Sequence, residues 1–480
     1  MKNYSRRKFI KKSGLTAAAS IGISSLTNIS CDDNTQIQSS QGKYMGGFAA
    51  PKLGLIRAAF IGVGYRGKGH LKYFGNLSGS EVVAVCDLYE DNVNDAVERL
   101  KNFGGADKVK NIKKYWGDEN NWKLMLDETK PDVVFISTNW NNHAPMSIES
   151  MNKGAHVFVE VPIATNLEDM WSIIDASEKK QKHCMMLENV NYFRVEMMFL
   201  NMIRQNLIGD LQHAEAAYIH DLRFQMQEED RGTGSWRTSH YANSKGNLYP
   251  THGLGPVAQY MNLARTDDTF KSIVSYSSPA MGRKLYAEKN YSKNHKWNKL
   301  KFENGDLNTS IIKTQLGRTI LVQWDETSPR PYTRINLIQG TKGILSGHEI
   351  EKIGKNHRSN NPLRIAIDGG LKGVSDSSHE WVSGLDLNET IEKYDHPIWK
   401  RLNKKAEGSD HGGSDGIMLS RIAECLHKGI PLDQNVYEGC FWSSVTPLSA
   451  KSIDEDGVPQ NFPDFTRGNW KTTKPLDIVL

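Results

Sequence analysis

The chain of 480 residues is long enough for a leader followed by two domains. Its formal net charge of +5 comes from basic and acidic residues spread along the sequence, so charge gives no indication of nucleic-acid binding. The five cysteines show neither a C-x-x-C pair nor zinc-type spacing with histidine, and no metal site is predicted.

The N-terminus carries the pattern of an export signal. Residues 5–10, SRRKFI, form a twin-arginine signature, and residues 15–26 form a modest apolar region. That region is too short to span a membrane. Residues 1–31 are therefore predicted to be a twin-arginine signal peptide that exports an already folded protein. We expect the mature protein in the periplasm or tethered outside the cytoplasmic membrane.

Cys31 leaves the mode of cleavage open. The preceding residues 28–30, NIS, resemble a degenerate lipoprotein cleavage site in which Asn28 is atypical. Lipid anchoring to the membrane at Cys31 and plain cleavage nearby are two alternatives that the sequence does not separate.

Residues 32–54 are polar and then rich in glycine and alanine, which predicts a linker. From residue 55 to 180, apolar strand-like runs alternate with helical patterns, as doubly wound α/β domains require. The predicted strands are 55–63, 82–85, 133–137 and 156–159, with helices at 93–102 and 146–153. This pattern predicts a Rossmann domain whose ligand lies at the carboxyl ends of the strands.

The glycine turn after the first predicted strand fits a dinucleotide. Gly62, Gly64 and Gly67 have the G-x-G-x-x-G spacing that lets backbone approach a pyrophosphate at a helix N-terminus. Asp87 ends the second strand 20 residues after Gly67, where a ribose-binding carboxylate belongs. An ordinary tight turn would explain the glycines alone, but not both strands and the acid. Because a carboxylate repels a 2′-phosphate, Asp87 favours NAD over NADP.

Two further strand ends face the predicted cofactor crevice. Residues 137–143, STNWNNH, follow the third strand, and Glu160-Val161-Pro162 follows the fourth. Their position predicts contact with the nicotinamide and its ribose. The alternatives are a helix-capping or structural role for His143 and a solvated loop acid at Glu160.

The pattern changes after residue 188. Residues 214–218, 319–324 and 333–338 are typical of longer antiparallel strands, and 197–205 and 417–427 of helices packed on them. Residues 181–480 are therefore predicted to form an α+β substrate-binding domain on an open, largely antiparallel sheet. The polar stretch 359–404 receives no assignment. The open sheet face would suit contact between copies of the chain, and the oligomeric state stays undetermined.

The order of glycine turn, acid, T-x-x-x-x-H and E-x-P resembles the Gfo/Idh/MocA oxidoreductase superfamily. Its dehydrogenase members usually carry Glu-Lys-Pro, and that lysine transfers a proton during hydride exchange. Val161 replaces the lysine here, which disfavours a plain sugar dehydrogenase.

Six motifs together resemble one branch of that superfamily, glycoside hydrolase family 109, whose characterised members are NAD-dependent α-N-acetylgalactosaminidases. The motifs are GGFAAP at 46–51, WNNH at 140–143, EVP at 160–162, HDLR at 220–223, YPTHG at 249–253 and HGGSD at 411–415. The last of these is explained nearly as well by a glycine-rich start of a helix, and we leave it outside the predicted site.

The resemblance implies roles for individual residues. The implied NAD contacts are Tyr65, Arg66, Asp87, Trp140, Asn141, Asn142, His143, Glu160, Val161 and Asn189. The implied substrate contacts are Tyr218, Arg237, Tyr249, Pro250, Thr251, His252 and Tyr332, with Tyr249 and His252 as the acid/base pair. Without the family, Tyr249 and His252 could equally be a core tyrosine with its hydroxyl satisfied by a histidine, and Arg66 a solvated first-turn residue.

A protein that binds a nicotinamide cofactor can hydrolyse a glycoside by oxidation, elimination and hydration. Oxidation of C3 acidifies the C2 hydrogen, a base removes it, the C1 substituent leaves, water adds, and the hydride returns. Such a route needs a hydride acceptor and proton-transfer groups, not the paired carboxylates of ordinary glycosidases. Because NAD ends as it began, a folded protein can carry its cofactor through export.

Two other functions fit the sequence less well. An exported sugar oxidoreductase with a retained nicotinamide cofactor would oxidise one sugar and reduce another, and Val161 counts against it. A sugar-binding or assembly protein could keep NAD as a structural ligand only. Release of an aglycone separates the predicted glycosidase, which acts on a glycoside or glycan, from both.

Overall fold

The computed structural model describes residues 42–349, 352–353, 357–358 and 363–476. The predicted signal peptide and Cys31 lie outside these residues. Within the described ranges, no helix is both long enough and apolar enough to cross a bilayer. In the same part of the chain, His, Cys, Asp and Glu side chains form no group of three that could hold a metal ion.

The first domain is built on six parallel strands in the order β3-β2-β1-β4-β5-β6, the Rossmann order. The strands are β1 (Ile56–Ile61), β2 (Ser80–Cys86), β3 (Lys113–Tyr115), β4 (Val133–Ile136), β5 (His156–Val159) and β6 (Cys184–Met186). The connecting helices are α1 (Tyr65–Asn76), α2 (Glu90–Gly104), α3 (Asn121–Thr129), α4 (Trp140–Asn152) and α5 (Leu167–Lys180). All four predicted strands and both predicted helices are confirmed.

The central strands are apolar because helices cover both faces of the sheet. Phe60, Phe135 and Phe158 occupy the same register on β1, β4 and β5 and stack with ring centroids 4.8 and 5.1 Å apart. Phe74 on α1 packs against the middle ring at 4.7 Å. This ladder fixes the register, so that the carboxyl ends of β1, β4 and β5 lie side by side.

The second domain is built on a nine-stranded mixed sheet in the order β16-β15-β12-β11-β7-β10-β9-β8-β17, in which only the β10–β7 pair is parallel among the described strands. Its strands are β7 (Leu211–Ile219), β8 (Phe270–Ser277), β9 (Asn308–Thr314), β10 (Thr319–Asp325), β11 (Thr333–Gly340), β12 (Gly343–Glu349), β15 (Arg364–Ile367), β16 (Val382–Ser383) and β17 (Gln460–Asn461). A separate two-stranded ribbon joins β13 (Lys352–Ile353) to β14 (His357–Arg358). The predicted largely antiparallel sheet is confirmed.

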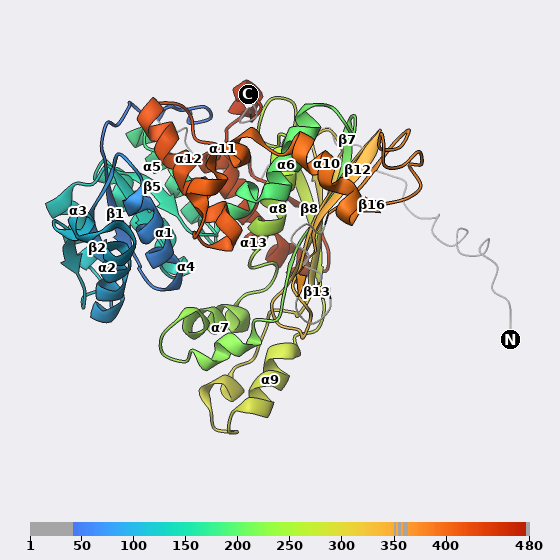
Figure 1. Cartoon of the computed structure of the whole chain (residues 1–480). Helices are drawn as coiled ribbons and strands as arrows, with labels where there is room; N and C mark the ends of the chain where they lie inside the picture. Colours follow the sequence, from blue (N-terminus) through green and yellow to red (C-terminus); the bar gives the residue numbers. More distant parts are fainter. Residues whose placement is uncertain (1–41, 350–351, 354–356, 359–362, 477–480) are drawn as a thin grey trace, which may run out of the picture. The chain divides into compact units, whose positions relative to one another are not determined.

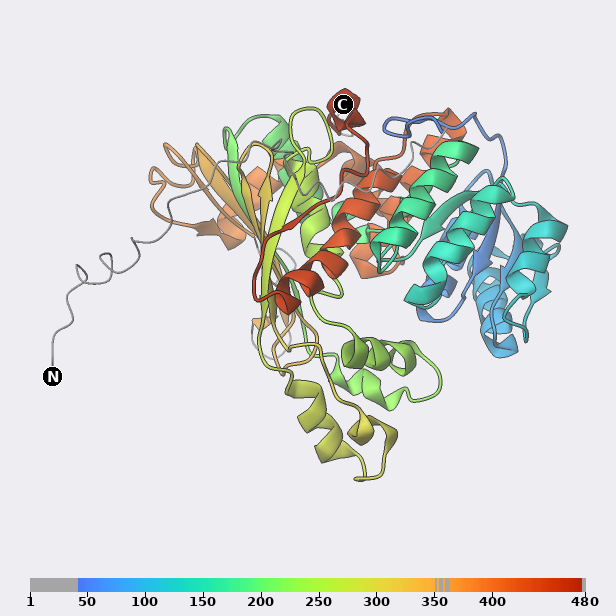
Figure 2. The same cartoon turned by 180° about the vertical axis from the view of Figure 1, so that it is seen from behind.

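In the described part of the chain, three helices pack on strands of this sheet: α6 (Arg194–Arg204), α8 (Thr251–Tyr260) and α13 (Val436–Asp454). The other helices of this part of the chain are α7 (Thr233–Asn243), α9 (Gly282–Asn290), α10 (Asn388–Tyr394), α11 (Pro397–Ala406) and α12 (Ser414–Lys428). Helix α8 packs on β7 and β11, and α13 packs on β8, as the view from behind shows (Figure 2). Helix α12 packs on α1, next to the glycine turn (Figure 1).

The described part of the predicted linker, residues 42–54, forms neither helix nor strand but packs against the protein. Met45 and Ala50 are each 3% exposed. The backbone N–H of Met45 donates to the hydroxyl of Tyr437, and that of Leu53 donates to the carbonyl of Leu426. These apolar and backbone contacts tie the segment to α12 and α13. It is therefore a fixed part of the fold.

Candidate active site

The glycine turn between β1 and α1 leaves room for a dinucleotide. Gly62 has φ +78°, and a Cβ there would lie 2.6 Å from the carbonyl oxygen of Ser137. A Cβ on Gly67 would lie 1.9 Å from the carbonyl oxygen of Gly62. A Cβ on Gly64 would meet nothing closer than 4.0 Å, so the backbone there faces open space at the start of α1. This cradle fits a pyrophosphate held by backbone N–H groups.

Asp87 lies at the carboxyl end of β2 and supports the turn from the side. Its Oδ2 accepts a hydrogen bond from the backbone N–H of Val63 at 2.8 Å. Its Oδ1 accepts from the N–H of Tyr89 at 3.0 Å and from the Asn92 amide at 3.1 Å. The carboxylate is half-buried at the rim of the crevice, the position predicted for a ribose contact.

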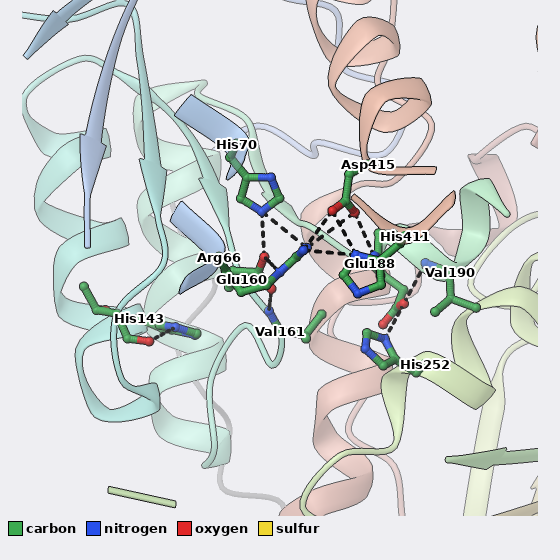
Figure 3. A network of polar contacts seen from close by, with 12 residues as sticks. Arg66, His70, His143, Glu160, Val161, Glu188, Val190, His252, His411 and Asp415 are labelled. Carbon is green, nitrogen blue, oxygen red and sulfur yellow. Dashed lines mark hydrogen bonds and ion pairs between the residues drawn. The ribbon is translucent and has the colours of Figure 1, made fainter. Parts of the chain in front are cut away.

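Arg66, in the first turn of α1, is the centre of a polar network that joins distant parts of the chain (Figure 3). Its Nε donates to Oε1 of Glu160 at 3.0 Å, and its Nη1 donates to Oδ2 of Asp415 at 2.8 Å. His70 lies 2.7 Å from the same Glu160 oxygen, and Asn189 donates to Oδ1 of Asp415 at 2.8 Å. Arg66 is therefore a bound network residue, not a solvated one.

The network holds two acids in their charged form. Burial alone would disfavour the carboxylate of Glu160, but Arg66 and the hydrogen bond with His70 hold its pKa well below the usual range. Burial of Asp415 is likewise outweighed by Arg66 and His411, which keep the pKa of Asp415 well below its usual value. Both acids stay ionised at neutral pH because Arg66 lies between them.

Residues 140–143 begin α4 at the carboxyl end of β4. Trp140 is 3% exposed and faces the second domain, with its ring 4.9 Å from those of Trp236 and His240. His143 is buried, and its Nδ1 and Nε2 lie 2.7 and 3.2 Å from the carbonyl oxygens of Pro162 and Thr138. Burial lowers the pKa of His143. The ring bridges the loops that follow β4 and β5. This contact agrees with a structural role for His143, which was the alternative to a cofactor contact.

Val161 is 3% exposed and follows Glu160 directly. Its backbone N–H donates to Oε2 of Glu160 at 3.3 Å. A valine here has no group that can transfer a proton. The proton-transfer group that the dehydrogenases carry at this position is therefore missing here.

The predicted substrate residues of the second domain form one aromatic cluster. The Tyr218 ring centroid lies 5.2 Å from that of Tyr249, 5.0 Å from that of His252 and 6.1 Å from that of Tyr332. Tyr249 lies 4.8 Å from His252 and 6.2 Å from Trp140. The cluster therefore reaches Trp140 at the carboxyl end of the Rossmann strands, and the predicted cofactor and substrate residues meet.

Arg237 on α7 packs against this cluster. Its Cζ lies 4.9 Å from the ring centre of Tyr249 and 5.1 Å from that of Trp140. Its Nη1 is 3.6 Å from Oε1 of the fully buried Glu326. Burial disfavours the guanidinium, but Glu326 and the neighbouring phenols raise the pKa of Arg237 above its usual range. The arginine thus presents a fixed positive charge to the cluster.

The phenols around Arg237 keep their protons. Burial raises the pKa of Tyr249, although Arg237 opposes this, and burial also raises the pKa of Tyr218. The Tyr218 hydroxyl lies 2.8 Å from Nε2 of His220. Burial lowers the pKa of that histidine, so the pair is a neutral hydrogen bond at neutral pH.

His252 contacts a residue that the sequence did not single out. Its Nδ1 lies 2.7 Å from Oε1 of Glu188, which has no exposed surface. Glu188 follows β6, and its Oε1 also accepts from the backbone N–H of Val190 at 3.1 Å. Glu188 and His252 are 64 residues apart, so no local spacing could have revealed the pair.

Five of the predicted residues show little side-chain interaction. Tyr65 is 83% exposed, Asn141 is exposed and Asn142 half-buried. Pro250 precedes α8 as its N-cap, and the buried hydroxyl of Thr251 has no hydrogen-bond partner within the described structure. Their predicted contacts with NAD or substrate stay predictions.

Asp415 and His70 join Glu188 as site residues that the sequence reasoning missed. Asp415 lies in the HGGSD motif, where Gly412 and Gly413 have φ +65° and +100° and start α12, so the helix-start explanation was correct but incomplete. His70 is one helical turn after Arg66 on the same face of α1. That spacing was the available signal for His70.

Two sequence families match the chain, one over each of the two domains. Residues 56–188 match the oxidoreductase family with an NAD-binding Rossmann fold. Residues 192–472 match the family described as glycosyl hydrolase 109, C-terminal domain. The first match includes β6, beyond the predicted boundary at residue 180.

Curated relatives cover nearly the whole chain. Glycosyl hydrolase family 109 protein 1 of Akkermansia muciniphila is 54% identical over 438 residues, which is 91% of this chain and 87% of the relative. A second Akkermansia muciniphila protein is 50% identical over 99% of both chains. The glycosyl hydrolase family 109 protein of Shewanella baltica is 46% identical over 100% of both chains.

Solved structures share the fold. An NAD binding oxidoreductase from Klebsiella pneumoniae has a TM-score of 0.63 at 14% identity, covering 86% of this chain and 100% of that one. Levoglucosan dehydrogenase in complex with NADH and L-sorbose has a TM-score of 0.60 at 16% identity, covering 85% and 99%. At these identities the likeness is one of fold.

Proposed function

Because the chain belongs to glycosyl hydrolase family 109, an assignment that makes it an NAD-dependent glycoside hydrolase, we propose that it cleaves α-N-acetylgalactosaminides by transient oxidation at C3. The observation that carries the proposal is the meeting of two residue sets. Tyr218, Tyr249 and His252 contact one another, and their cluster reaches Trp140 at the Rossmann strand ends. The sugar itself is taken from the family resemblance.

The cofactor residues of the chain fit NAD. The open backbone at Gly64 would hold the pyrophosphate, and Asp87 would hold the ribose hydroxyls of the adenosine. Bound NAD would supply a reversible hydride acceptor, so that the net reaction is hydrolysis without oxidation. Trp140, beside the cluster, excludes water from the apolar side of the crevice.

Proton transfer is assigned to Tyr249 and His252. Tyr249 keeps its proton at neutral pH because burial raises its pKa, and it is therefore a proton donor in the resting site. His252 is the imidazole beside it, with ring centres 4.8 Å apart. Arg237, over the Tyr249 ring, stabilises negative charge that develops on the sugar or the leaving oxygen.

Export of the folded holoprotein is part of the proposal. The twin-arginine pattern at residues 5–10 supports it, and a closed catalytic cycle in NAD removes any need for a supply of cofactor outside the cytoplasm. Attachment through a lipid on Cys31 and cleavage without lipid remain the two alternatives. Mass spectrometry of the mature N-terminus distinguishes them.

The test uses purified mature protein, without added NAD, and p-nitrophenyl α-N-acetylgalactosaminide in heavy water. We expect release of nitrophenol together with deuterium at C2 of the freed sugar. Formation of a lactone or keto sugar without nitrophenol would instead support the sugar oxidoreductase. If neither occurs with any glycoside anomer, the proposed function is wrong.

A further inference from the structure

The buried contact between Glu188 and His252 has the geometry of an oriented general base. Resting on the proposed function, we propose that Glu188 is a positioning residue that holds the His252 imidazole with hydrogen on Nδ1, leaving Nε2 as the base for the C2 proton. Nothing in the sequence patterns of the site assigned a role to Glu188. The inference comes from its burial and from the 2.7 Å distance between Oε1 and Nδ1.

The burial of Glu188 needs an explanation. A carboxylate without exposed surface is costly unless a hydrogen-bond donor or cation compensates it. Its Oε1 accepts from Val190 and faces His252, while its Oε2 has no hydrogen-bond partner among the described residues. In that part of the chain, His252 is its only ion-pair partner. The Val190 N–H and the imidazole of His252 together compensate the acid at this position, and His252 is the only side chain of the two.

The local structure brings the two residues together rigidly. His252 lies in the first turn of α8, and two glycines of that turn allow close approach. A Cβ on Gly253 would lie 2.7 Å from the backbone nitrogen of Ala217 on β7. A Cβ on Gly255 would lie 3.0 Å from Cγ of Glu188. These close approaches fix the backbone of α8 against β7 and Glu188, so the backbone of His252 is held next to the acid.

The hydrogen bond decides which nitrogen is free. A carboxylate only accepts hydrogen bonds, so the facing Nδ1 must carry a hydrogen and Nε2 must carry the lone pair in the neutral ring. The ring keeps some contact with solvent, at 14% side-chain exposure, and lies beside Tyr218 and Tyr249. No hydrogen bond among the described residues occupies Nε2, which leaves this nitrogen for a substrate that contacts these rings.

The proton transfers then balance on a sugar whose C3 is a ketone. The C2–H bond breaks and its proton moves to Nε2 of His252. The electron pair left at C2 forms the C1–C2 double bond as the C1–O bond breaks, and the leaving oxygen takes the Tyr249 proton. Glu188 stabilises the imidazolium that forms. Addition of water reverses both transfers and restores the resting protonation states.

The first test reads the tautomer of the wild-type holoprotein without substrate. In protein labelled with ¹⁵N-histidine, the shifts and couplings of the two ring nitrogens show which one carries the hydrogen. The His252 signals are assigned by their absence in His252→Gln. We expect hydrogen on Nδ1. Hydrogen on Nε2 would overturn the inference, and this test needs no variant of Glu188.

The second test compares Glu188→Gln with Glu229→Gln. The control removes the charge of a similar acid, 2.9 Å from Nε2 of His295 but 37% exposed and outside the cluster. In Glu188→Gln the side-chain amide can donate a hydrogen bond to Nδ1, which favours the tautomer with hydrogen on Nε2. Because Nε2 then cannot accept the C2 proton, we expect kcat to fall at least on the order of 100-fold while KM stays within about threefold. NAD content of the purified variant stays at the wild-type level, which separates this loss from unfolding.

The outcomes keep the inference and the proposed function apart. If the wild type cleaves no glycoside, the proposed function fails, while the ring-nitrogen spectrum still decides for or against the role of Glu188 in holding His252. If Glu188→Gln cleaves the nitrophenyl glycoside and exchanges C2 deuterium at the rates of Glu229→Gln, the inference is wrong and the function stands.

Discussion

Replacement of Arg66 by methionine tests whether the network at the glycine turn is a structural necessity. The guanidinium lies 3.0 Å from Glu160 and 2.8 Å from Asp415, whose side chains are 11% and 4% exposed. Arg66→Met keeps the unbranched apolar part of the side chain but leaves both buried carboxylates without their main cation. Removing one partner of a buried pair costs about 3–5 kcal/mol of stability.

The assay is urea unfolding at pH 7 of wild type and variant freed of NAD, because a change in NAD affinity would otherwise alter the apparent stability. The matched control is Arg231→Met. Arg231 pairs with Asp91 at 2.8 Å, but the two side chains are 41% and 70% exposed, so we expect a much smaller loss of stability than in Arg66→Met.

The pH dependence of the free energy of unfolding gives a second test of Arg66→Met. In the wild type, the folded pKa of Glu160 and of Asp415 is lowered, so their contribution is present above about pH 4 and is lost as pH falls through the folded values. Without Arg66, burial raises both pKa values and the acids take up protons at milder pH. The stability difference between variant and wild type should therefore be smaller at pH 5 than at pH 7. A loss no larger than that of Arg231→Met, unchanged between these pH values, would refute the reasoning.

Three further substitutions test other parts of the structure. Tyr249→Phe removes the proton donor, so nitrophenol release should fall about 100-fold or more while bound NAD, measured after acid extraction, is retained; release at the normal rate would remove Tyr249 from the mechanism. Gly62→Ala places a Cβ 2.6 Å from the Ser137 carbonyl at positive φ, so purified protein should contain less NAD and unfold about 1–3 kcal/mol more easily; wild-type NAD content would contradict the assigned cradle. His396 is fully buried, and burial lowers its pKa to about 4 although Asp433 and Asp395 favour its charge. Because the unfolded chain binds this proton near pH 6.5 and the folded chain does not, acidification from pH 7 to 5 should cost about 2 kcal/mol through this group. His396→Asn keeps the cap on the Ile398 N–H and should remove that part of the pH dependence in urea titrations, and an unchanged slope would contradict it.

The sequence predicted the Rossmann sheet well because its strands are buried on both faces. Runs such as Val133–Ile136 and His156–Val159 lie between helices, so almost every side chain is apolar and the run stands out. The family and the NAD-binding domain are also confirmed by the comparisons. The short strands β3 and β6 were not predicted, since three residues hold too little pattern.

The stretch 359–404 could not be assigned from its sequence. Strand β16 has only two residues, and α11 buries a narrow stripe, Ile398, Trp399, Leu402 and Ala406, among basic residues. Its fold depends on contacts made elsewhere, such as the Trp399 indole donating to the carbonyl of Tyr192. Tertiary packing, not local propensity, determines this segment.

Site residues were predicted from short motifs or from the family resemblance. The turn at Gly62 and the Tyr249–His252 pair are local, whereas Glu188 acts on His252 across 64 residues and Asp415 on Arg66 across 349. A single sequence does not show such pairs, because neither member is unusual in its own neighbourhood. Both pairs become visible only in the three-dimensional structure.

The contact between Arg66 and Asp415 also sets an order of events during biosynthesis. Arg66 leaves the ribosome 349 residues before Asp415, so the nascent Rossmann domain can hold Arg66 against Glu160 but lacks its second acidic partner from α12. The network at the glycine turn is therefore completed only after α12 has been synthesised.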